Sequence, residues 1–298
     1  MNIYEMVTDR IIKQMESGII PWQQPWTGGA NVAISHVTGR AYSLLNQLLL
    51  GMESGEYITF NQCKAEGGTV RKGEKSRLVV FWTWLPKKGE PKPEKGEEID
   101  TSKCIPYLRG YNVFHINQCD GIKPRFLKDD TDTKVLDPIG SAEDVVKGYF
   151  DRETCTLNVC NSASAYYSPS QDRVVVPQLS QYKHAEEYYS TLFHEMTHST
   201  GHKDRLDRFK DDKSSMFGSE EYSREELVAE MGSAFILGRL GIDTDKAFKN
   251  HVGYLQNWLQ HIKGDSKMVV LAAGKAEAAA NYIIDGVRPA RFNKTNNQ

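Results

Sequence analysis

The sequence predicts an α+β protein of two domains: an N-terminal α+β domain and a C-terminal, mainly helical domain with a small sheet. Its 298 residues exceed the usual length of one domain. Apolar residues recur with helical and strand periods on both sides of a stretch rich in Asp, Lys and Thr at 126–141. We therefore predict domains at 1–125 and 142–298, joined by a linker at 126–141.

The N-terminal domain is predicted from two apolar periods. Val7, Ile11 and Met15 fall on one face of a helix, and Gly18 follows as a stop. The segment 86–102 consists of Lys, Glu, Gly and Pro with almost no apolar residue, which is typical of a mobile hairpin tip between two strands. The predicted elements are helices over 4–17 and 42–52, a Pro- and Trp-rich loop over 21–26, and strands over 78–85 and 108–116.

The C-terminal domain is predicted to be mainly helical. Its last helix is rich in Ala and apolar at helical spacing, as expected of a core helix. The predicted elements are helices over 142–150, 184–201, 225–235 and 268–284, and strand-like segments near 163–167 and 173–176.

Composition predicts a cytoplasmic protein without a membrane segment. Apolar residues make up 39% of the chain, and their runs stop well short of the roughly 18 residues that span a bilayer. The N-terminus lacks the basic and apolar regions of a secretion signal. The five cysteines are scattered without a CxxC pair, which predicts free thiols.

Charge is shared unevenly between the two predicted domains. Residues 1–125 carry 16 Lys and Arg against 13 Asp and Glu, whereas the remainder carries 21 against 26. This asymmetry is a mild indication that the first domain meets nucleic acid and the second does not.

The run from His194 to His198 reads HEMTH, the HExxH pattern of zinc metallopeptidases, within the predicted helix 184–201. Residues i and i+4 lie about one turn apart on one helix face, so both imidazoles can bind one cation with Glu195 beside it. A catalytic zinc takes three protein ligands and keeps a water, whose proton Glu195 can accept and pass to the leaving amine. A chance match on an exposed helix is the alternative, but the flanking residues are too apolar for one. We expect one Zn²⁺ per chain.

The third protein ligand of the predicted zinc site is expected to be an acidic residue. Glu226 and Glu230 lie one turn apart on the predicted helix 225–235, a spacing that resembles the glutamate zincins, in which the first acid binds metal and the second supports it or a histidine. We predict Glu226 as the ligand and Glu230 as a partner of a ligating histidine. Glu230 and Asp204, which fits the spacing HExxHxxGxxD, are alternative ligands. Ser223 to Glu226 also matches a capping box, which would engage Glu226 at a helix terminus.

Six motifs, three in each predicted domain, occur together in this chain. They are Gly18-Ile-Ile-Pro-Trp-Gln-Gln-Pro-Trp26, Gly39-Arg-Ala-Tyr-Ser-Leu-Leu-Asn46, Gly68-Thr-Val-Arg-Lys-Gly-Glu-Lys75, the HEMTH run, Thr200-Gly-His-Lys-Asp-Arg-Leu-Asp-Arg208 and Tyr222-Ser-Arg-Glu-Glu-Leu-Val-Ala-Glu230. Together they resemble the ArdC-type antirestriction proteins of plasmids and mobile elements, with Ser43 departing from the more frequent glycine. The resemblance covers nearly the whole chain. It implies an N-terminal domain that binds single-stranded DNA and a C-terminal zincin-like metallopeptidase domain.

Binding of a single strand without sequence preference needs aromatic rings for unstacked bases and cations for phosphates. Trp82 and Trp84 are further stacking candidates, but they share one strand face, so a place in the core is the favoured interpretation. Asn46 is a candidate only because it belongs to the family pattern. The basic residues on both sides of Gly73, from Arg71 to Arg77, are also consistent with a solvent-exposed turn. The DNA-binding candidates are Trp22, Trp26, Arg40, Tyr42, Asn46, Arg71, Lys72, Lys75 and Arg77.

Three functions fit these patterns. The preferred one is an antirestriction-type protein that binds single-stranded DNA and carries a zinc-dependent peptidase domain. The first alternative is a dedicated peptidase that acts on DNA-bound protein substrates. The second is a DNA-binding protector whose zincin-like domain is structural and inactive.

Overall fold

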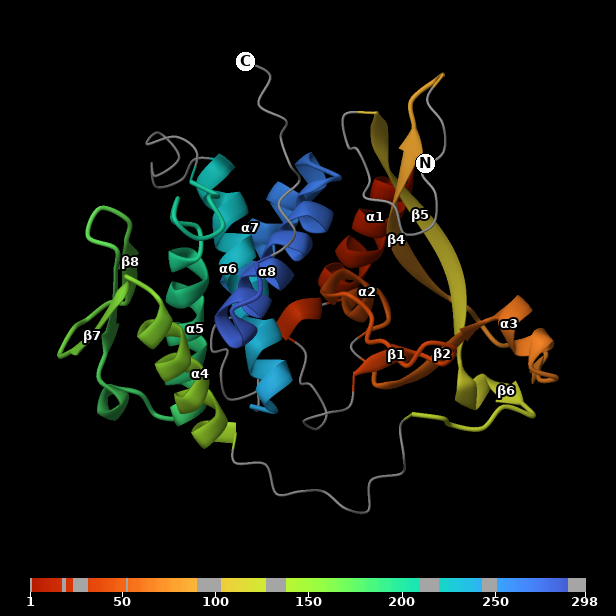
Figure 1. Cartoon of the computed structure of the whole chain (residues 1–298), viewed down its shortest axis with the longest axis horizontal. Coiled ribbons are helices and arrows are strands. Elements are labelled where there is room, and N and C mark those ends of the chain that lie inside the picture. Colours follow the sequence, from red (N-terminus) through yellow and green to blue (C-terminus); the bar gives the residue numbers. More distant parts are fainter. Residues whose placement is uncertain are drawn as a thin grey trace.

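The structure is a computed structural model that describes residues 2–17, 20–23, 32–51, 53–89, 103–126, 138–209, 220–242 and 251–288. Within these ranges, the side chains of residues 23, 83, 84, 106, 138, 220–222 and 251–257 are left undescribed. The described residues form the α+β structure of two parts that the sequence predicts, and Figure 1 shows the parts side by side. Most of the predicted linker 126–141 lies outside the described residues.

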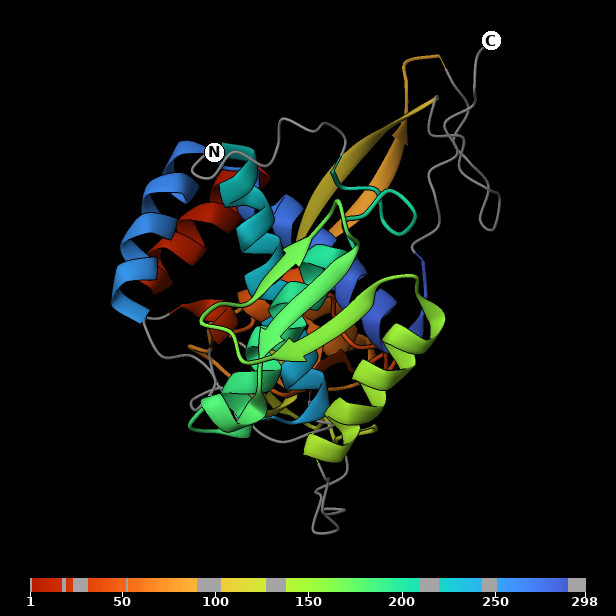
Figure 2. The same ribbon diagram turned by 90° about the vertical axis from the view of Figure 1, so that its left-hand side faces the viewer.

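The N-terminal part is built on a four-stranded sheet. Its elements are α1 (Ile3–Glu16), η1 (Pro21–Gln23), β1 (Ala33–Ser35), α2 (Leu44–Leu49), β2 (Gly55–Thr59), α3 (Phe60–Ala65), β3 (Thr69–Val70), β4 (Arg77–Pro86), β5 (Cys104–His115), η2 (Ile116–Gln118) and β6 (Cys119–Asp120). The sheet order is β1-β2-β5-β4, with β1 parallel to β2 and the other neighbours antiparallel, while β3 and β6 form a separate pair. The β4–β5 hairpin is the predicted one, and its far end projects beyond the helices (Figures 1 and 2).

Local chemistry explains the first helix. The side chain of Asn2 accepts a hydrogen bond from the backbone N–H of Glu5, and the Glu5 carboxylate accepts one from the backbone N–H of Asn2. This reciprocal capping satisfies two donors that a helix terminus otherwise leaves unpaired. Val7, Ile11 and Met15 are fully buried, as their helical spacing predicts.

The C-terminal part combines helices with a three-stranded sheet of order β7-β9-β8. Its elements are α4 (Pro138–Arg152), β7 (Thr156–Cys160), β8 (Tyr166–Ser168), β9 (Arg173–Pro177), η3 (Leu179–Gln181), α5 (Ala185–Ser199), α6 (Glu220–Leu240), α7 (His251–Gly264) and α8 (Met268–Asp285). The sheet lies against α5 and faces the viewer in Figure 2. None of the described helices is long and apolar enough to cross a membrane, and all five cysteines are free thiols.

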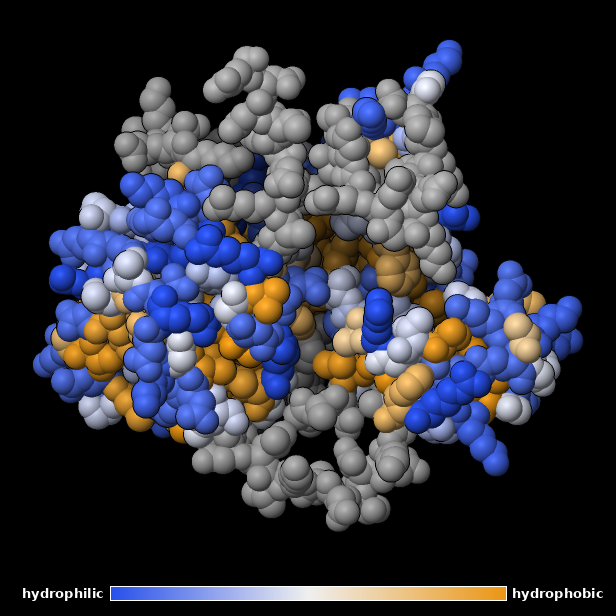
Figure 3. Space-filling view, in the orientation of Figure 1, coloured by the Kyte–Doolittle hydropathy of each residue, from blue (hydrophilic) through white to orange (hydrophobic). Residues whose placement is uncertain are grey.

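The hydrophobic core is continuous between the two parts. One cluster of buried side chains contains Val7, Met15 and Trp22 of the N-terminal part together with Phe193 and Ile262 of the C-terminal part. α1 packs on α7 and α8, and α2 also packs on α8. On the face shown in Figure 3, the described surface is largely hydrophilic with small apolar patches. The sequence predicts two separate domains, whereas the structure joins their helices in a single core.

Candidate metal centre

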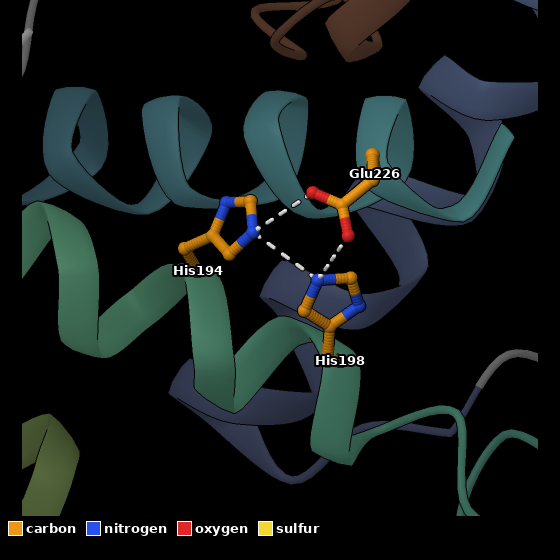
Figure 4. A group of neighbouring side chains, drawn as sticks. All are labelled: His194, His198 and Glu226. Atoms are coloured by element: carbon orange, nitrogen blue, oxygen red, sulfur yellow. Dashed lines mark hydrogen bonds and ion pairs between the residues drawn. The ribbon is translucent and has the colours of Figure 1, made fainter. Parts of the chain in front are cut away.

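Close packing of α6 on α5 positions the centre. Met196 and Thr197 are fully buried and hold one side of α5 against the core. A Cβ added to Gly232 of α6 would lie 2.7 Å from Cγ2 of Thr197, so only glycine permits this approach. The same approach places Glu226, nearly two turns earlier on α6, beside His194 and His198 of α5 (Figure 4).

Three side chains converge with the spacing of metal ligands. The Nε2 atoms of His194 and His198 are 3.1 Å apart. The Glu226 carboxylate lies 3.5 Å from Nε2 of His194 through Oε2 and 3.4 Å from Nε2 of His198 through Oε1 (Figure 4). Nitrogen and oxygen donors arranged tetrahedrally about one zinc, each about 2.0–2.1 Å from it, are about 3.3 Å from one another. Two imidazoles and a carboxylate at these separations therefore fit a divalent cation.

The electrostatics of the group also favour a cation. Burial alone would lower the pKa of His198, but hydrogen bonds to Glu225 and Glu226 outweigh it and raise the pKa to about 10. The pKa of His194 is also raised, since the hydrogen bond to Glu226 and the negative charge of Glu230 oppose the effect of burial. Burial would raise the pKa of Glu226, but both histidines hold it well below its usual range. A divalent cation bound here displaces the imidazole protons, because histidine binds metal in its neutral form.

A second carboxylate, Glu225, supports His198 from its other ring nitrogen. Oε1 of Glu225 lies 3.5 Å from Nδ1 of His198. Arg208 holds Glu225 by two hydrogen bonds of 3.1 and 2.6 Å, and it also donates to the backbone carbonyl of Thr197. A carboxylate behind a ligating histidine fixes the orientation of the ring. At His198 this partner is Glu225, because the phase of α6 turns Glu225 toward the ring, whereas the predicted partner Glu230 acts on His194 through its negative charge.

Among the described residues, Glu226 is the one candidate acid whose carboxylate lies within the donor group of the two histidines. Ser223 lies inside α6, which begins at Glu220, so the predicted capping box does not exist. Asp204 is 67% exposed, lies beside His202 and is not part of the donor group. Glu230 is not part of the group either, although its charge acts on His194.

Glu195 is a buried carboxylate next to the donor group, and its negative charge acts on His194. It is 9% exposed, and among the described residues it makes no hydrogen bond or ion pair. The pKa of Tyr182 is raised, mainly by burial, and a hydrogen bond to Thr191 partly opposes this rise. The negative charge of Glu195 adds to the rise, so Glu195 lies near this phenol. A carboxylate in this position is available to accept a proton.

A buried ion pair ties the C-terminal end of α5 to the three-stranded sheet. Arg205 is 2% exposed and donates from Nε to the carbonyl of Ser199 at 2.7 Å. Both of its Nη atoms donate to the carboxylate of Asp172, and Tyr167 donates to the same carboxylate at 2.8 Å. Burial would raise the pKa of Asp172, but the hydrogen bonds from Arg205 and Tyr167 lower it to about 2.

Comparisons with known proteins agree with this arrangement. The N-terminal domain of the anti-restriction factor ArdC matches residues 1–114, and the zincin-like metallopeptidase domain matches residues 146–275. Crystal structures of the antirestriction ArdC protein from plasmid R388, metal-free and Mn(II)-bound, are 33% and 31% identical to this chain, with TM-scores of 0.70 and 0.72. Each covers 95% of this chain and 97% of its own. The chain belongs to the ArdC family of antirestriction proteins.

Relatives of this ArdC chain include proteins of very different length. The uncharacterized protein y4eC of Sinorhizobium fredii is 31% identical, over 95% of this chain and 91% of its own. Two DNA primase TraC proteins of Escherichia coli are 31% and 30% identical, but the chain spans only 20% and 27% of their length. The predicted combination of an ArdC N-terminal domain with a zincin-like domain is confirmed.

Three of the DNA-binding candidates are buried in this ArdC chain, so these predictions are wrong. Trp22 is fully buried in the common core, where its ring cannot stack on a base. The Asn46 side chain donates to the carbonyl of Val80 at 2.8 Å and accepts from its N–H at 2.7 Å. The amide therefore makes the pair of hydrogen bonds that a strand next to β4 would make. Tyr42 is 9% exposed and packs edge to face on Tyr57.

The cationic candidates divide into paired and free side chains. Arg71 donates to the carbonyl of Asn117 and to Glu74, while Arg77 donates to the carbonyl of Leu50 at 2.7 Å and pairs with Glu53. Their guanidinium groups are therefore already engaged within the N-terminal part. Arg40, Lys72 and Lys75 are exposed and stay candidates. Trp26 and the side chain of Trp84 lie outside the described residues.

Proposed function

We propose that this chain is an antirestriction protein that binds single-stranded DNA through its N-terminal part and carries a zinc-dependent peptidase site in its C-terminal part. The observation that carries the peptidase proposal is the donor group of His194, His198 and Glu226, whose ligand atoms lie within 4.8 Å of one another beside the free carboxylate of Glu195. The DNA proposal is supported by membership of the ArdC family and by the exposed aromatic and cationic side chains of the N-terminal part.

His194, His198 and Glu226 would hold the metal, with Glu225 keeping the His198 ring in place. Zinc in such a site acidifies a bound water and polarises the scissile carbonyl. The Glu195 carboxylate takes the proton of the attacking water and delivers it to the nitrogen of the leaving amine. The Mn(II)-bound relative supports a divalent metal, and a donor set of two imidazoles and one carboxylate favours zinc.

Metal analysis of purified protein tests this site. We expect about one zinc per chain in the wild type, because a catalytic zinc takes three protein ligands. His194→Ala and His198→Ala should lose the zinc, and Glu226→Ala should retain little of it. Asp204→Ala is the matched control, since this acid stands outside the donor group. Full zinc in Glu226→Ala together with loss in Asp204→Ala would move the third position to Asp204.

The two alternatives, a DNA-targeted peptidase and a DNA-binding protector with an inactive zincin-like domain, share this site. A cleavage assay distinguishes them. The free carboxylate of Glu195 favours an active peptidase, because a purely structural zinc site has no use for a proton acceptor at its edge. Wild type and Glu195→Gln are incubated with single-stranded DNA carrying bound protein, and with the same protein alone. Cleavage by wild type only when DNA is present assigns a DNA-targeted peptidase. Zinc and DNA binding without any cleavage assigns a structural zincin-like domain.

A further inference from the structure

Helix α1 lies along one face of the β4–β5 hairpin, and a cleft opens along this seam. A Cβ at Gly110 of β5 would lie 2.9 Å from Cδ1 of Ile3, so glycine allows the helix to approach the strands closely. Nearer the hairpin tip, Tyr4 packs edge to face on Trp82, with ring centroids 6.0 Å apart. Farther along α1, a cleft of about 440 Å³, here called the α1–β4 cleft, is lined by Met6, Asp9, Arg10, Lys13, Ser76, Leu78 and Asn112.

The α1–β4 cleft contains a cation, Arg10, that forms no ion pair with any described residue. Arg10 is half-buried, and among the described residues it makes no hydrogen bond or ion pair. Its pKa is lowered, because burial removes water from the guanidinium and because Arg77 repels its charge. Lys13 adds a second cation to the lining, against one acid, Asp9. A half-buried guanidinium in this setting is stabilised by an anion, and the cleft is large enough to admit one.

An exposed indole lies on the same seam. Trp82 is 48% exposed although it is a large aromatic residue. It lies on the same face of β4 as Leu78 of the cleft, four residues away, or about 13 Å along the strand. Cations and an exposed aromatic ring along one track are what binding of a single strand requires.

The opposite face of the hairpin also carries aromatic residues, and these rings pack against one another or lie under a cation. The guanidinium of Arg109 lies over the ring of Tyr111, 5.2 Å from its centroid. Phe81 packs against Tyr111 and Tyr42, with centroid separations of 5.7 and 6.1 Å. Phe81 is 45% and Tyr111 38% exposed, both somewhat less than Trp82, and the guanidinium of Arg109 is already engaged by an aromatic ring.

We propose that the α1–β4 cleft holds a backbone phosphate of single-stranded DNA between Arg10 and Lys13, while a base of the same strand stacks on Trp82. This assignment rests on the proposed binding of single-stranded DNA and specifies where the strand lies. A duplex does not satisfy it, because paired bases have no free face for the indole. The Asp9 carboxylate stands beside the phosphate and weakens its binding.

Titrations of a fluorescently labelled oligo(dT) with the full chain test the assignment, because some variants should lower the affinity for the oligonucleotide and another should raise it. Arg10→Ala should weaken binding at least about fivefold and reduce the salt slope by about 0.7, the value for one phosphate contact on a single strand. Asp9→Asn should tighten binding about twofold, since it removes a repelling charge. Trp82→Ala should weaken binding at least about fivefold, and Trp82→Phe should restore part of the loss.

The matched control is Arg109→Ala, which removes the same charge from the opposite face of the hairpin and should bind within about twofold of wild type. The melting temperature of Arg10→Ala should not fall, because Arg10 makes no ion pair with the described part of the chain that the substitution would break. Loss of binding in Arg109→Ala with none in Arg10→Ala would overturn the proposal and place the strand on the other face. Binding of polyglutamate, an anion without bases, is measured as well. If Arg10→Ala weakens it too and Trp82→Ala has no effect, the cleft is a general anion site, contrary to the proposal. A wild type that binds no oligo(dT) would instead refute the DNA-binding function itself.

Discussion

Arg208 holds Glu225 in a two-point ion pair, and Glu225 in turn faces Nδ1 of His198, whose Nε2 belongs to the proposed metal site. The chain of contacts joins the segment after α5 to α6 and ends on a ligand. The guanidinium of Arg208 is nearly buried, at 6% exposed, so the ion pair is shielded from solvent and salt.

The first prediction concerns metal affinity. Glu225→Gln and Arg208→Ala should each weaken zinc binding about 10- to 100-fold, because the partner that orients His198 is lost or left unsupported. Competition with a chromophoric chelator measures the affinity. Arg239→Ala is the control, since Arg239 lies on the same helix but pairs with Asp285 at a solvent-exposed site. Unchanged affinity in Glu225→Gln would show that the carboxylate does not support the ligand.

The second prediction separates metal binding from proton transfer at Glu195. Glu195→Gln keeps the shape of the side chain but removes the proton acceptor, so zinc should stay bound while any peptidase activity falls by several orders of magnitude. Oligo(dT) affinity should stay within about twofold of wild type, because distant sites without shared partners act independently. Zinc content, cleavage rate and a DNA titration on the same preparation decide this. Loss of zinc in the variant would make Glu195 a ligand.

The third prediction tests the contact that brings α6 to α5. Gly232→Ala forces a methyl group against Thr197 and should lower stability by about 1–3 kcal/mol, because neither helix can move away without opening the core. Gly274→Ala on α8 has open space around its Cβ and should raise stability by about 0.5–1 kcal/mol through helix propensity alone. Thermal melts compare the two variants. Equal stabilisation by both would disprove the close approach of α5 and α6.

The fourth prediction is a pH dependence of stability from the pair of Asp172 and Arg205. The pKa of Asp172 is about 2 in the folded chain against an ordinary 3.8, so its contribution of about 2 kcal/mol is present above pH 4 and is lost as pH falls toward 2. Urea unfolding across this window should show wild type losing stability faster than Asp172→Asn. Parallel pH profiles of the two proteins would mean that the ion pair contributes nothing.

The fifth prediction concerns the common core. The sequence predicts a separate domain at residues 1–125, but α1, η1 and α2 share their core with the C-terminal helices. The isolated fragment would expose Val7, Ile11, Met15 and Trp22, and it should bind a hydrophobic dye and melt without cooperativity. A cooperative melt with wild-type DNA affinity would restore the prediction of two independent domains.

Features that depend on local spacing can be predicted from the amino-acid order. His194 and His198 are four residues apart on a helix, so their imidazoles share one face whatever that helix packs against. The α+β class, the long hairpin and the amphipathic first helix follow from apolar periods of the same local kind. The motifs along the chain likewise sufficed to identify the ArdC family.

Features that depend on contacts between distant segments could not be predicted in this way and became visible in the folded chain. Spacing alone leaves Glu226, Glu230 and Asp204 as possible third ligands, and the approach of α6 to α5 at Gly232 brings Glu226 to the histidines. The rotation of α6 about its axis also turns Glu225 toward His198. The sequence shows two adjacent acids but not which of them faces which histidine. Aromatic and polar residues were misjudged for the same reason: Trp22 and Asn46 have the chemistry of DNA contacts, but packing buries both. Arg10, the cation of the proposed phosphate site, carries no signal in the sequence, because its burial and its lack of an ion pair among the described residues arise only on folding.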